Sequence, residues 1–214
     1  MNNVYENNMR FLPILKFWDK YKKIISLLVL TLIGLITFFI INKQINKYQS
    51  EQAALIYNDW QTELQSEEPN IENLNSLLDE FLKSYKKTGY TQLALLEKAN
   101  LDAKLKNYDE ALYNFNELIM LTDGARDNKI FNKISRVSAS RILLSLERYD
   151  EALSMIEKYS LGDTNAPIHE LAGDILFKQG KVNLAINQYE AAEEKYTDQT
   201  SKSIISMKIA SISN

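Results

Sequence analysis

The sequence predicts an all-α protein in which one transmembrane helix precedes a solenoid of helical hairpins that ends in a capping helix. Three observations lead to this fold class. Residues 24–41 form an uncharged apolar run, the pentapeptide Tyr-Asp-Glu-Ala-Leu occurs at 108–112 and again at 149–153, and only six glycines and three prolines interrupt the 214 residues. A recurring motif at near-constant spacing is typical of stacked repeat units, and scarce helix breakers favour helices throughout.

Residues 24–41 have the length of a membrane span. They contain no charged residue and no proline, and a helix of this length extends about 27 Å, close to the thickness of the hydrocarbon core. Ser26, Thr31 and Thr37 are tolerable there because their hydroxyls can bond back to the helix. A buried core helix would rarely be so uniformly apolar. A cleaved signal peptide would be followed by small residues, whereas residues 41–52 are polar and bulky.

The charges around the span predict its orientation. Residues 1–23 hold five basic and two acidic residues, whereas only Lys43 and Lys47 follow the span closely. The positive-inside rule therefore places residues 1–23 in the cytoplasm and residues 42–214 on the far side of the membrane. The remainder of the chain has 20 basic and 26 acidic residues, which argues against nucleic-acid binding.

Helices follow one another along the soluble part. Residues 42–66 continue the membrane helix, Pro69 interrupts it, and residues 71–87 form a second helix that Gly89 is expected to end. Three hairpins and a cap come next, with predicted helices at 91–106 and 109–121, 129–147 and 150–159, 167–179 and 182–196, and 201–212.

The hairpins align on one register. Tyr108, Tyr149 and Val182 occupy equivalent positions, 41 and 33 residues apart, and the second spacing is close to the 34 residues of a tetratricopeptide repeat. About seven additional residues fit the polar loop 122–128. Asp109 and Asp150 are expected to cap the second helix of their hairpins. Close helix crossings explain the small residues of this register, which are Ala111, Ala152 and Ala185.

The chain resembles the YfgM-like family, the ancillary subunits of the bacterial SecYEG translocon. The similarity covers residues 16–212 and is clearest in Phe-Trp-Asp-Lys-Tyr-Lys-Lys at 17–23, Leu-Leu-Glu-Lys-Ala-Asn-Leu at 95–101 and Glu-Leu-Ala-Gly-Asp-Ile-Leu at 170–176. The resemblance implies a bacterial inner-membrane protein with periplasmic repeats that contacts the translocon and periplasmic chaperones. It brings no catalytic residue. Residues 1–15 depart from many family members.

No pattern in the sequence indicates catalysis, a metal or a cofactor. Cysteine is absent, His169 is the only histidine, and no metalloprotease, nucleophile-elbow or phosphate-loop motif occurs. The acidic pairs at 67–68 and 193–194 are adjacent in sequence, so they do not face one another on a helix. We therefore expect a binding protein and not an enzyme.

The concave groove of the solenoid is the candidate binding surface. In tetratricopeptide stacks the first helix of each hairpin lines this groove, and such surfaces bind extended or helical segments. The repeat register directs six polar residues toward it: Asn100, Lys104, Arg141, Ser145, Asp174 and Lys178.

These features of the sequence favour one function and leave an alternative. The first is a membrane-anchored adaptor that binds proteins at the periplasmic side of the Sec export machinery and links translocon and chaperones. The alternative is a self-associating scaffold of the cell envelope, acting in division or outer-membrane maintenance. Partners are proteins in both cases, the bilayer contacts residues 24–41, and no nucleic acid is involved.

Overall fold

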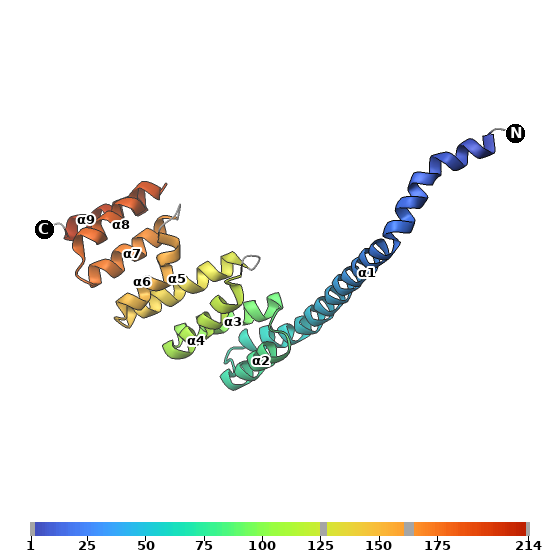
Figure 1. Cartoon of the computed structure of the whole chain (residues 1–214). Coiled ribbons are helices and arrows are strands. Elements are labelled where there is room, and N and C mark those ends of the chain that lie inside the picture. Colours follow the sequence, from blue (N-terminus) through green and yellow to red (C-terminus); the bar gives the residue numbers. More distant parts are fainter. Residues whose placement is uncertain (1–2, 125–127, 161–164, 213–214) are drawn as a thin grey trace. The chain divides into compact units, whose positions relative to one another are not determined.

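The computed structural model describes residues 3–124, 128–160 and 165–212. These residues fall into two compact units, Met1–Gln52 and Ala53–Asn214. Within the described ranges the chain is helical without strands (Figure 1). The helices are α1 (Asn3–Leu64), α2 (Ile71–Ser84), α3 (Gly89–Lys104), α4 (Tyr108–Thr122), α5 (Lys129–Ser145), α6 (Tyr149–Ser160), α7 (Ala166–Lys178), α8 (Val182–Lys195) and α9 (Gln199–Ile212).

Helix α1 contains the apolar run. From Lys20 onward it is long and apolar enough to cross a membrane, and none of the residues in its most apolar stretch is buried. This exposure contradicts the alternative of a buried core helix. The hydroxyls of Thr31 and Thr37 donate to the carbonyls of Leu28 and Ile33, at 2.8 and 2.9 Å. The hydroxyls of these two threonines are thus satisfied within the helix, as a span in hydrocarbon requires.

The second unit is a stack of helical hairpins. We call α3, α5 and α7 the first helices and α4, α6 and α8 the second helices of the three hairpins. Each helix packs on its sequence neighbours, and successive first helices also touch, α3 with α5 and α5 with α7. Among the described residues no comparable contact joins successive second helices. The first helices therefore form the inner side of the stack, where neighbouring hairpins come closest.

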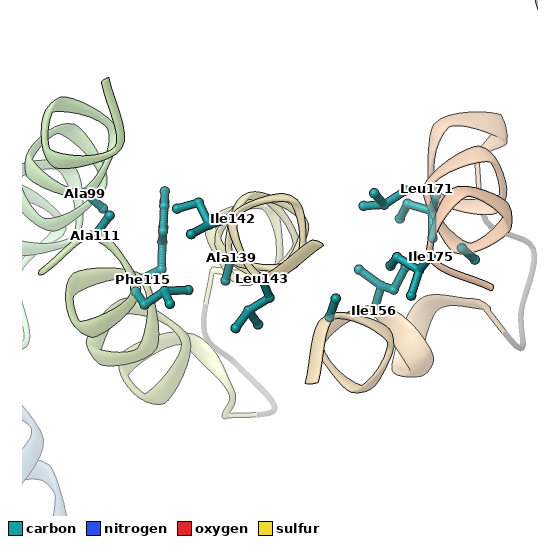
Figure 2. Close-up of a cluster of buried hydrophobic side chains, with 13 residues drawn as sticks. Ala99, Ala111, Phe115, Ala139, Ile142, Leu143, Ile156, Leu171 and Ile175 are labelled. Atoms are coloured by element: carbon teal, nitrogen blue, oxygen red, sulfur yellow. The ribbon is translucent and has the colours of Figure 1, made fainter. Parts of the chain in front are cut away.

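The predicted small and large positions form the core between hairpins. Ala111 and Ala152 are fully buried, and Phe115 and Ile156 lie one turn further along α4 and α6 with at most 1% of their surface exposed. Figure 2 shows Phe115 pointing toward α5, with Ile156 beside the residues of α7. Burial of each such large apolar side chain contributes about 1.5–3 kcal/mol, so these contacts hold successive hairpins together.

One turn geometry recurs in all three hairpins. Lys106, Glu147 and Gly180 follow the first helices and have φ of 64°, 59° and 76°. In each turn the next amide reaches back to a carbonyl of the first helix: Asn107 to Asp102, Arg148 to Leu143 and Lys181 to Leu176, all at 2.9 Å. These are the bonds of a Schellman motif, which ends a helix with one left-handed residue. The shared geometry confirms the repeat register read from the sequence.

Two local predictions were wrong. Helix α2 ends at Ser84, and Gly89 is the first residue of α3, where the hydroxyl of Thr88 accepts the amide of Thr91. Helix α4 begins at Tyr108, so Asp109 lies within its first turn, where it faces the positive end of the helix dipole without occupying the cap position. Asp150 has the same place in α6. The predicted loop 122–128 lies partly outside the described residues.

Candidate protein-binding groove

A furrow lies between two first helices, α5 and α7, on the inner side of the stack. It encloses about 270 Å³. We call it the α5–α7 furrow. Its lining residues are Lys133, Ile134, Val137, Ser138, Arg141, Asn165, Pro167 and Ile168. The furrow therefore combines apolar side chains with two cations and with small polar groups, a composition that suits a segment of another polypeptide.

The apolar part of the furrow comes from both helices. Ile134 on α5 is 40% exposed, and Val137 on the same helix is half-buried. Ile168 on α7 is buried, and Pro167 is exposed at the start of that helix. Isolated exposed leucines and isoleucines are normal on a protein surface, but here the apolar side chains gather in one concave place.

Both charged residues of the furrow are basic. The Nζ of Lys133 lies 5.8 Å from the ring centroid of Tyr159, which holds the ammonium by a cation–π contact. Arg141 is exposed two turns further along α5, within electrostatic range of Glu170 on α7. Within the described ranges neither Lys133 nor Arg141 forms an ion pair at 4.0 Å or less. Both cations therefore remain available to an incoming carboxylate.

The six predicted groove residues have different environments. Arg141 lines the furrow, whereas Lys178 lies in a separate depression beside Gln179 and Glu147. Asn100 and Lys104 are exposed on α3. Ser145 donates its hydroxyl to the carbonyl of Ile142 at 2.7 Å. Asp174 belongs to a network with the capping helix, so the structure brings these six residues to several places along the stack and not to one site.

The capping helix α9 is fastened to α7 by a polar network. The Nζ of Lys208 lies 2.8 Å from a carboxylate oxygen of Glu170 and 2.7 Å from one of Asp174. Tyr189 donates to Asp174 at 2.7 Å, and Tyr196 donates to Glu170 at 2.6 Å. Burial opposes ionisation of Glu170, yet hydrogen bonds from Lys208 and Tyr196 hold its pKa below the ordinary glutamate value. Both carboxylates of α7 are thus engaged by the cap, and among the described residues that line the furrow the charged ones are Lys133 and Arg141.

A buried ion pair distinguishes the first hairpin. Lys98 stands where the other hairpins have alanine, and Asp102 stands where they have leucine, and the surfaces of the two residues are only 2% and 1% exposed. The ammonium lies 2.6 and 2.7 Å from the two carboxylate oxygens, and Asn114 donates to the same carboxylate at 3.0 Å. The two charges of α3 therefore neutralise each other in the buried contact between α3 and α4. This pair is thus part of the packing and not a free binding group.

His169 is also buried and contributes to the packing of α7 against α8. It is 6% exposed, and its Nδ1 lies 2.9 Å from the side-chain oxygen of Gln188 on α8. Among the described residues no group of three histidine, aspartate or glutamate side chains is arranged to hold a metal ion.

Sequence reasoning missed Lys133 and Ile134 as furrow residues. A signal was present, because the helix that contains them has four basic residues and no acidic one. The repeat register points to Arg141 and Ser145, which lie in the second half of the helix, whereas the furrow lies over its middle.

Comparison with known proteins agrees with the fold described above, a stack of helical hairpins. The family model of a tetratricopeptide repeat-like domain matches residues 15–214. An ancillary SecYEG translocon subunit of Aggregatibacter actinomycetemcomitans is 26% identical over 116 residues, which cover 54% of this chain and 55% of the relative. The match thus spans about half the length of that relative, and it supports the resemblance to ancillary translocon subunits.

Two solved structures have a similar arrangement of helices. One is MamA 41-end from Desulfovibrio magneticus RS-1, with a TM-score of 0.52 and 16% identity over 75% of this chain and 92% of that chain. The other is a MamA RS-1 ArsTM double mutant, with a TM-score of 0.50 and 14% identity over 75% and 94% of the two chains. At these identities the likeness concerns the fold alone.

Proposed function

The chain belongs to the tetratricopeptide repeat-like domain family, and from that membership we propose that it is a membrane-anchored adaptor which binds proteins at the export machinery. Its partners are translocon subunits, periplasmic chaperones or exported clients. It works by binding and positioning proteins and not by catalysis. The similarity to an ancillary SecYEG translocon subunit supports the choice of machinery.

The anchor determines where the adaptor acts. Residues 24–41 cross the inner membrane once, residues 1–23 stay in the cytoplasm, and residues 42–214 lie in the periplasm. The excess of basic residues before the span supports this orientation. A fixed anchor raises the effective concentration of the solenoid near other membrane proteins, which favours weak contacts that would not persist in free solution.

The observation that supports binding most strongly is the α5–α7 furrow. It joins apolar side chains to two cations that form no ion pair with any described residue, on the inner side of a repeat stack. Extended inner surfaces are what solenoid proteins use to hold partners.

Reversal of exposed charges on the first helices tests the proposal. The double variant Lys104→Glu/Arg141→Glu changes two exposed side chains on α3 and α5 and should fold normally. Expressed as the full chain and purified with its partners in mild detergent, it should recover at least fivefold less translocon or chaperone than the wild type. The matched control Lys83→Glu/Lys87→Glu changes the same charge at two other exposed positions. Equal recovery with both variants would remove the support for a groove-based adaptor.

A further inference from the structure

The distribution of charge over the solenoid points to the chemistry of the partner. We propose that the α5–α7 furrow binds an extended acidic segment of a partner protein, in which an apolar side chain stands between two carboxylates. The inference rests on the proposed adaptor function and names the class of segment that the adaptor takes.

The two sets of helices in the stack have opposite charge. The second helices α4, α6 and α8 contain nine acidic residues and two lysines. The first helices α3, α5 and α7 contain seven basic and four acidic residues. The chain as a whole is slightly acidic, so the basic inner side is a local feature that its composition conceals. Such a field attracts an acidic segment to the inner side and repels it from the outer side.

The basic charge concentrates on α5. This helix has four basic residues and no acidic one. Arg136 is paired with Asp123, and Lys129 donates to the carbonyl of Gly124. Lys133 and Arg141 are the remaining two, and both line the furrow. The acidic residues of the neighbouring first helix α7 have their ion pairs with Lys208 of the cap, so the charged residues among the described furrow lining are both basic.

The spacing of the two cations sets the spacing of the ligand. Lys133 and Arg141 are eight residues apart on one helix, which separates their Cα atoms by about 12 Å. An extended chain advances about 3.3 Å per residue, so carboxylates about four positions apart match that separation. Ile134 and Val137 lie between the cations, so a large apolar side chain midway between the carboxylates would meet an apolar surface.

Peptide binding to the full chain in lipid nanodiscs tests this assignment. The probe is a fluorescein-labelled nine-residue peptide with glutamate at its third and seventh positions, leucine at its fifth, and serine or glycine elsewhere. Fluorescence anisotropy should show saturable binding that weakens as salt is raised, because exposed charges are screened. A peptide with glutamine in place of both glutamates should bind at least tenfold more weakly, and one with serine in place of leucine at least threefold more weakly.

Variants locate the binding to the furrow. Arg141→Glu should weaken binding of the acidic peptide at least tenfold and Arg141→Gln at least threefold, with unchanged thermal unfolding. Lys83→Glu on α2 is the matched control and should stay within twofold of the wild type. Equal binding of the glutamine peptide, or an Arg141→Glu variant that binds like the wild type, would overturn the inference. Concentration-dependent dimerisation that the acidic peptide displaces would overturn it as well, because the acidic outer side of a second copy would then be the occupant.

The experiments distinguish a failure of the inferred furrow chemistry from a failure of the proposed adaptor function. If the acidic peptide binds but the full chain does not associate with export components in cells, the adaptor role is wrong and the furrow chemistry stands. If the association in cells persists while the peptide does not bind, the furrow chemistry is wrong and the adaptor role stands.

Discussion

Gly173 shows how one residue positions the end of the solenoid. A Cβ atom built at this glycine would lie 2.5 Å from Cε1 and 2.6 Å from Cδ1 of the Tyr189 ring. The Tyr189 hydroxyl in turn donates to Asp174, which binds Lys208 of the capping helix. The absence of a side chain at position 173 therefore allows α8 to approach α7 and places the tyrosine that supports the cap.

Substitution of Gly173 tests this dependence. Gly173→Ala forces the Tyr189 ring to move and should destabilise the chain by about 1–3 kcal/mol, the usual cost of overpacking. We expect the melting temperature to fall by several degrees, measured by circular dichroism in detergent. Gly89→Ala is the control, since a Cβ there meets nothing within 4 Å. A Gly173→Ala variant as stable as Gly89→Ala would show that the contact does not constrain α8.

At the scale of the element, the hairpin turns use one backbone geometry with three different residues. Gly180 adopts its positive φ without steric cost, whereas Lys106 and Glu147 carry a Cβ in the same left-handed conformation. The repeat tolerates these two residues because the helix-ending hydrogen bonds of the turn are retained.

Glycine at the two strained turns should stabilise the chain. Lys106→Gly and Glu147→Gly should each raise stability by about 0.5–1 kcal/mol, because the strain of the left-handed residue outweighs the added freedom of the unfolded chain. Gly180→Ala should lower stability. Melting temperatures of the three variants check this, and a decrease for both glycine variants would mean that the side chains of Lys106 and Glu147 contribute more than their backbone strain costs.

The sequence predicted elements better than it predicted the groove. Helix α4 at 108–122 was expected at 109–121, because the repeated pentapeptide and the apolar spacing are local signals. Gly89 was misassigned because glycine suits both the end of one helix and the start of the next. Asp174 was expected in the groove, but the later helix α9 brings Lys208 to it. Lys208 and Asp174 are 34 residues apart in the sequence, and a repeat register, which compares equivalent positions, cannot predict such a contact.

At the scale of the whole molecule, an apolar anchor and a charge-segregated solenoid define what the chain can do. In the proposed adaptor, the anchor would determine the location, and the furrow on the inner side would determine which partner binds. Neither part contains a group of metal-binding side chains among the described residues. The proposed role, a membrane-anchored adaptor that binds proteins, uses both parts.

Site-specific photo-crosslinking in living cells tests this adaptor role most directly. The photoreactive residue is placed at Arg141 in the furrow, with controls at Leu184 on the second-helix side, which is 52% exposed, and at Leu30 within the span. We expect crosslinks from position 141 to translocon subunits or periplasmic chaperones, with much weaker products from position 184. Crosslinks from position 141 only to a second copy of the chain or to cell-wall proteins would contradict the adaptor role and favour an envelope scaffold.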